Sequence, residues 1–86
     1  MKLYHIWQNK VQGWDTFSDA VVVANSAREA RRMYPGSGWN RVQMLPLEYQ
    51  PSSWANDPRD VKCKLIGEAH KSFTKLGFIC KSFHAG

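Results

Sequence analysis

Apolar residues in this chain occur in short runs separated by turn-forming residues, and these runs predict four strands. Residues 3–8 form an apolar and aromatic run that is typical of a strand. Residues 20–24 are all small or β-branched, which predicts a strand in the middle of a sheet with both faces covered. Residues 61–66 alternate between apolar side chains and lysines, as in a half-buried strand, and residues 78–83 form the last strand. We expect these last two strands to pair as an antiparallel hairpin.

A helix is predicted to begin at Ser26 and to run to about Tyr34. The Ser26 side chain can accept a hydrogen bond from a free backbone amide, and Glu29, three residues later, can complete a capping box. The Pro-Gly pair that follows Tyr34 ends the helix. One side of the helix is apolar, with Ala27, Ala30, Met33 and Tyr34 at helical spacing. The other side carries Arg28, Arg31 and Arg32.

Residues 36–58 contain several glycines and prolines, which interrupt any long element. A short strand within residues 42–47 and one helical turn over residues 57–60, with proline at its first helical position, fit this pattern. Trp39 and Trp54 give the segment large side chains with which it can pack. We therefore expect an ordered loop, the kind of segment in which functional residues are often found.

The order of elements is strand, strand, helix, irregular segment, strand, strand, and the short connections favour antiparallel pairing. We predict an α+β fold in which one principal helix packs on a four-stranded, mainly antiparallel sheet. The 86 residues are predicted to form a single domain, residues 1–86, because so short a chain can build only one core. A chain of this size buries a limited share of its surface, so a homodimer would add stability.

The chain is basic, with 12 Lys and Arg against 7 Asp and Glu and a formal net charge of +5. This charge favours an acidic partner, such as nucleic acid, a nucleotide or an acidic protein surface, and it argues against a mimic of DNA. No run of five like charges occurs, so a solvated basic surface is the alternative interpretation. The first twenty residues include many polar side chains, which predicts neither a signal peptide nor a membrane helix and favours the cytoplasm.

The chain contains no recognisable pair of nucleophile and base, no paired catalytic carboxylates and no phosphate-binding loop, so we expect no enzyme activity. Gly36-Ser37-Gly38 lacks the ending of a Walker loop and follows the helix, which indicates a turn. The three histidines and two cysteines are too widely spaced for a typical zinc site, and we expect no metal or other cofactor. Cys63 and Cys80 are interpreted as buried, reduced thiols, with a disulfide between neighbouring strands as the alternative.

Two residue types could bind a partner without catalysis. Guanidinium groups hold phosphate or carboxylate in a forked contact, and indole rings stack on bases or fill protein pockets. The arginines at positions 28, 31 and 32 share one helix face because they stand three and four residues apart, although a solvated outer face of the helix is the alternative. The candidate binding residues are Arg28, Arg31, Arg32, Trp39, Arg41 and Trp54.

Several segments together resemble small phage and prophage accessory proteins. They are Met1-Lys2-Leu3-Tyr4, Asp15-Thr16 before Ala20-Val21-Val22-Val23-Ala24, Ser26-Ala27-Arg28-Glu29-Ala30-Arg31, the turn from Pro58 to Val61, and Phe83-His84-Ala85-Gly86. The resemblance implies an accessory phage protein that acts in the cytoplasm of the bacterial host. Proteins of this kind often inhibit host defence, as anti-CRISPR proteins and sponges for immune nucleotide signals do.

We therefore expect a binding protein that acts stoichiometrically on a host defence protein or complex. The alternative is a sponge for a nucleotide or cyclic-nucleotide immune signal, and a further alternative is weak nucleic-acid binding. No membrane partner is expected.

Overall fold

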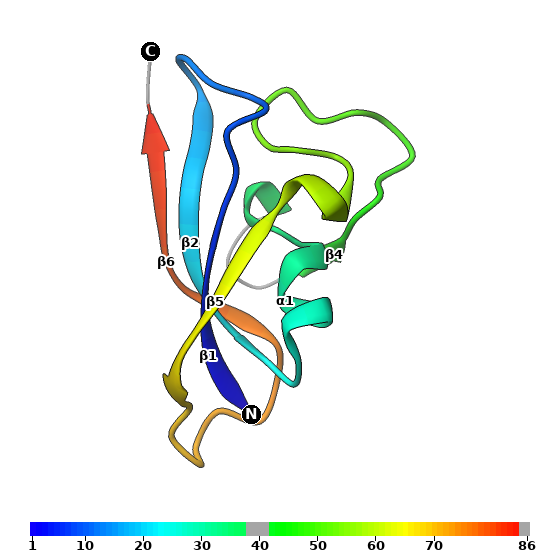
Figure 1. Ribbon diagram of the computed structural model, residues 1–86. Coiled ribbons are helices and arrows are strands. Elements are labelled where there is room, and N and C mark those ends of the chain that lie inside the picture. The colour runs from blue at the N-terminus through cyan, green and yellow to red at the C-terminus, as the bar shows by residue number, and fades with distance from the viewer. Residues whose placement is uncertain (38–41, 85–86) are drawn as a thin grey trace.

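A four-stranded antiparallel sheet forms the centre of the computed structural model, which describes residues 1–37 and 42–84 (Figure 1). Its strands are β1 (Lys2–Trp7), β2 (Thr16–Ala24), β5 (Lys62–Glu68) and β6 (Gly77–His84), in the order β5-β1-β2-β6. One helix, α1 (Ala27–Arg32), follows β2. The predicted α+β fold, with a four-stranded sheet and one short helix, is confirmed.

The last two strands do not form the predicted hairpin. β5 pairs with β1, and β6 pairs with β2, so the two late strands lie at opposite edges of the sheet. Residues 69–76 connect these edges past the end of the central pair (Figure 1). The prediction failed because alternation identifies a strand but not its neighbour, and the central β1–β2 pair offered each late strand a free edge.

The chain between β2 and β5 covers one side of the sheet. The short elements of this segment are β3 (Met33–Tyr34), η1 (Pro35–Ser37), β4 (Gln43–Met44) and η2 (Pro58–Asp60). Together with α1 they lie on the same side, and no described element covers the other side, which is called the open face below (Figure 1). The core between sheet and cover includes Tyr4, Ile6, Ala20, Val22, Ala30, Met33, Leu45, Trp54 and Val61.

Helix α1 begins as predicted but ends two residues early. The backbone amide of Glu29 donates to Ser26 Oγ at 3.2 Å, and the Glu29 carboxylate accepts from the amide of Asn25 at 2.8 Å. Met33 takes an extended conformation, with φ −77° and ψ 128°, and pairs with Met44. The helical spacing correctly placed Met33 on the buried side. The last predicted helical turn is replaced by the pairing of β3 with β4.

Residues 45–57, between β4 and η2, are called the long loop below. Ser53 and Trp54 attach this loop to the sheet. The amide of Phe17 on β2 donates to the Ser53 carbonyl at 2.9 Å, and the hydroxyls of Ser53 and Tyr34 are hydrogen-bonded at 2.8 Å. The next residue, Trp54, is fully buried in the core, with 0% of its surface exposed. Its indole Nε1 has no hydrogen-bond partner among the described residues. Trp54 therefore packs the loop as predicted, and its burial leaves no surface for the binding role that was also predicted for it.

Replacing Ser26 with Ala is expected to lower the free energy of unfolding by about 1 kcal/mol, because the Glu29 amide loses its acceptor. Chemical denaturation of the two proteins measures this difference. Ser52→Ala, at an exposed loop position, is the control and should unfold like the original protein. Equal midpoints for Ser26→Ala and the original protein would show that the cap contributes nothing to stability.

Trp54→Ala is expected to lower the free energy of unfolding by about 3 to 5 kcal/mol, since it leaves a large cavity in the core. Trp54→Phe should cost less, because it fills part of the space and removes an indole N–H that has no described acceptor. Trp14→Ala is the control, because the Trp14 side chain is 76% exposed. Thermal unfolding measures all three, and a larger loss from Trp14→Ala than from Trp54→Ala would contradict the assignment.

Candidate functional site

Four arginines surround a shallow depression beside Pro58, which we call the arginine hollow. Arg28, Arg31 and Arg32 come from α1, and Arg59 comes from η2. The helical residues share one face because of their spacing, and η2 packs beside α1, which brings Arg59 to the same place. The structure therefore assembles the three predicted helical arginines and adds a fourth that the sequence analysis missed.

The four guanidinium groups differ in their local partners. Arg59 makes a forked ion pair with Asp57: Nη2 donates to Oδ2 at 2.7 Å and Nε donates to Oδ1 at 3.2 Å. This pairing lowers the pKa of Asp57 to about 2, so its carboxylate stays charged near neutral pH. Arg32 donates from Nη1 to the Leu45 carbonyl at 3.1 Å, which ties it to the loop.

Arg28 and Arg31 are exposed, as is Arg59. Unlike Arg59, neither Arg28 nor Arg31 makes an ion pair with a carboxylate of the described residues. Guanidinium groups in such positions can hold a carboxylate or a phosphate through two parallel hydrogen bonds. An anion bound here would also relieve the repulsion among like charges, so the arrangement favours an acidic ligand.

The predicted tryptophan partners of these arginines are not in the described hollow. Trp54 is in the core and cannot stack on a ligand. Trp39 and Arg41 lie outside the described residues. No aromatic ring of the described residues lines the arginine hollow, so it offers charge without a stacking surface.

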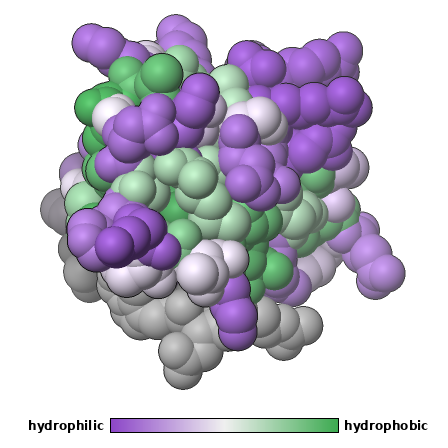
Figure 2. Space-filling view, turned by 90° about the horizontal axis from the view of Figure 1, so that it is seen from below, coloured by the Kyte–Doolittle hydropathy of each residue, from purple (hydrophilic) through white to green (hydrophobic). Residues whose placement is uncertain are grey.

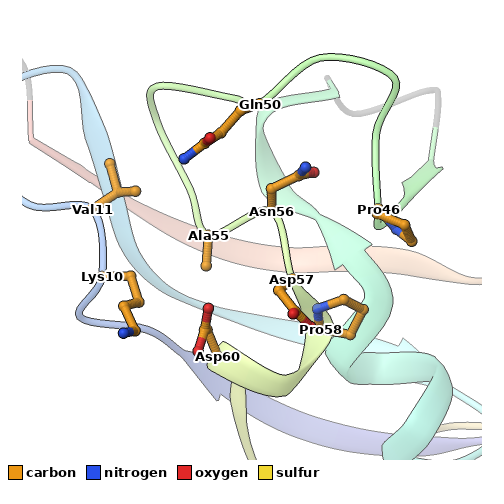
Figure 3. A pocket seen from close by; sticks show the side chains of 9 residues that line it. All are labelled: Lys10, Val11, Pro46, Gln50, Ala55, Asn56, Asp57, Pro58 and Asp60. Carbon is orange, nitrogen blue, oxygen red and sulfur yellow. The ribbon is translucent and has the colours of Figure 1, made fainter.

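A second pocket lies between the β1–β2 loop and the long loop, and polar and apolar side chains line it in similar proportion (Figure 3). Two of its polar groups are already engaged: the Asn56 side-chain oxygen accepts from the Leu47 amide at 2.9 Å, and Asp57 caps η2 by accepting from the Arg59 amide at 2.9 Å. Lys10, Gln50 and Asp60 also line the pocket. Because Asp57 is held ionised by Arg59, it is unsuited to act as a general acid near neutral pH.

A third, more apolar depression lies where the β1–β2 loop meets the end of β6. Gln8 and Trp14 line it together with His84. Gln8 is buried and uses its amide to hold the loop, donating to the carbonyls of Val11 and Phe17 and accepting from the Val11 amide. Trp14 is the most exposed large apolar side chain of the described residues, so this depression is a secondary candidate for contact with a partner.

Exposed apolar side chains also occur near the connection between β5 and β6. They are Leu65, Ile66, Phe73 and Ile79. Figure 2 views the molecule from below and shows hydrophobic surface between projecting hydrophilic side chains. The alternation in residues 61–66 predicted Leu65 on the buried side, but this end of β5 extends beyond the cover, and Leu65 is exposed.

The two cysteines are separated by the width of the sheet. Cys63 is on edge strand β5 and Cys80 is on the opposite edge strand β6, so the alternative of a disulfide between neighbouring strands is wrong. Cys63 is half-buried, and burial raises the pKa of its thiol, whereas Cys80 is exposed, contrary to the prediction that both are buried. Within residues 1–37 and 42–84, no group of three or more potential ligands could hold a metal ion.

A lysine lies against aromatic rings on the covered side of β6. Lys81 Nζ is 4.6 Å from the centroid of the Phe78 ring and 5.9 Å from that of the Phe17 ring. Burial lowers the pKa of this amine. The contact with the rings accounts for the position of Lys81 as a stabilising interaction.

No helix in the described part of the chain is long and apolar enough to span a membrane. Comparisons with protein-family models, with curated proteins and with solved structures find no match to this chain.

Proposed function

We propose that this protein acts by stoichiometric binding rather than by catalysis, and that the arginine hollow is its contact with an acidic partner. The observation that carries the proposal is the convergence of four guanidinium groups from α1 and η2, of which Arg28 and Arg31 have no described carboxylate partner. A concentration of positive charge of this kind attracts anions, which supports a contact surface over a merely solvated helix face.

The proposed partner is an acidic surface of a bacterial host defence protein, which this protein would block by occupying it. The resemblance to phage accessory proteins supports a host partner, and the hollow supplies forked contacts for carboxylates. A mononucleotide fits less well, because no described aromatic ring lines the hollow to stack on a base. The nucleotide-sponge alternative is therefore the weaker proposal.

Reversing the two charges that have no described carboxylate partner, in the double variant Arg28→Glu and Arg31→Glu, should weaken binding at least about tenfold, which corresponds to about 1.4 kcal/mol. The binding measurements are recovery of host proteins from a bacterial lysate and titration with a labelled oligoglutamate peptide. Both residues are exposed, so thermal unfolding should change little. The double variant Lys71→Glu and Lys75→Glu makes the same change of charge in the β5–β6 connection and should bind normally.

Asp57→Asn provides the opposite test. Asparagine caps a helical turn about as well as aspartate, so η2 should persist, while Arg59 loses its charged partner and the hollow loses a negative charge. The variant should bind the oligoglutamate peptide several-fold more tightly than the original protein. Unchanged affinity in both this variant and the Arg28/Arg31 variant would remove the arginine hollow from the binding site, and a large thermal shift with a cyclic nucleotide would favour the sponge instead.

A further inference from the structure

The open face of the sheet presents an aromatic stack on β1, one of its two central strands. Tyr4 and Ile6 of β1 point into the core, so the alternate residues His5 and Trp7 project from the open face. Their rings are stacked, with centroids 4.9 Å apart and an interplanar angle of 25°. His5 Nε2 is also 2.8 Å from Asp19 Oδ2 on β2, which fixes the imidazole and thereby supports the indole. Both rings remain partly exposed.

Two lysines flank this stack on the neighbouring edge strand. In the β1–β5 register, Lys62 lies opposite Trp7 and Lys64 lies opposite His5. Both lysines are exposed, and neither makes an ion pair with a described carboxylate. Residues two apart on a strand are separated by about 7 Å, so the two ammonium groups form a short row beside the rings.

On the other flank, the surface carries an apolar side chain and a carboxylate that is hydrogen-bonded to His5. Val21 on β2 lies opposite His5 and is only half-buried. Asp19 lies opposite Trp7, and its carboxylate is held by His5. The open face thus combines a ring on which a planar group can stack with a row of positive charges along one side.

We propose that the open face binds single-stranded nucleic acid, with a base stacked on Trp7 and backbone phosphates placed along Lys62 and Lys64. Stacking on an exposed aromatic ring and contact of phosphates with lysines are the two interactions by which proteins hold single strands of any sequence. A duplex is a poorer ligand, because its bases are stacked on one another and cannot stack on the partly buried ring of Trp7. The proposal does not depend on the arginine hollow, which is built by other elements.

Charge also argues against a second copy of the chain as the occupant of the open face. In a symmetric dimer the same patch is used by both subunits, so the row formed by Lys62 and Lys64 would face an identical row. Bringing these charges together without a described anion nearby would oppose association. A polyanion removes the same repulsion.

The test is the binding of a fluorescently labelled oligothymidylate of about 12 nucleotides, a length within the usual site size, measured by anisotropy at several salt concentrations. We expect the original protein to bind it and to prefer it to the same sequence annealed to its complement. The double variant Lys62→Gln and Lys64→Gln should bind at least about tenfold more weakly at low salt. It should also show a slope of log affinity against log salt reduced by about 1.4, because two phosphate contacts are lost.

Variants of Trp7 separate stacking from charge. Trp7→Phe keeps an aromatic ring and should retain most of the affinity, whereas Trp7→Leu should lose most of it without changing the salt slope. The double variant Lys71→Gln and Lys75→Gln has the same net charge as the Lys62/Lys64 variant and should bind like the original protein. Thermal unfolding identifies any variant that fails to fold. The four lysines are exposed, so the lysine variants still test the proposal if substitution of Trp7 unfolds the protein.

Three results would overturn the proposal. They are no binding of oligothymidylate by the original protein, an equal loss of affinity in the Lys62/Lys64 and Lys71/Lys75 variants, or a dimer in solution whose stability the Lys62/Lys64 change alters. The Arg28→Glu and Arg31→Glu variant distinguishes the two proposed sites. If it loses the oligoglutamate peptide but keeps oligothymidylate, both proposals stand. If it keeps both ligands while the Lys62/Lys64 variant loses oligothymidylate, the arginine hollow fails and the open face remains.

Discussion

Burial of Trp54 is the interaction on which the rest of the structure depends. The long loop has little regular structure of its own. It joins the core through this indole together with Leu45 and Ala55, and through the hydrogen bonds of Ser53. A small domain has few large side chains with which to fill its core, so one fully buried tryptophan contributes a large share of the apolar contact. Without it, the cover over β1 and β2 would lose its central contact.

The same packing has consequences for the candidate site. Because Trp54 holds the end of the long loop against the sheet, η2 follows close to α1, and Arg59 joins the helical arginines. The ion pair between Arg59 and Asp57 then moderates the charge of the hollow without neutralising Arg28 and Arg31. The core and the arginine hollow are therefore coupled through the loop: a change in the core can alter the hollow without touching an arginine.

A one-sided cover divides the molecule into two surfaces of different character. The covered side carries the cluster of guanidinium groups, which suits carboxylates or phosphates. The open side offers stacked rings and a row of lysines suited to an unpaired strand of nucleic acid. Edge strand β5 lies between the two, since Cys63 faces the side of Arg31 while Lys62 and Lys64 face the open side.

The sequence by itself determined the features that depend on neighbours along the chain. Alternation and β-branching located the strands, Ser26 and Glu29 located the start of the helix, and the spacing of arginines placed three of them on one face. Only the tertiary structure decided that β5 and β6 lie at opposite edges, that Trp54 is in the core, and that Arg59 joins the hollow. Each of these depends on contacts between residues far apart in sequence, which local periodicity cannot specify. The lysines of β5 were recognised as one face of a strand, but their place beside Trp7 followed from the pairing of β5 with β1.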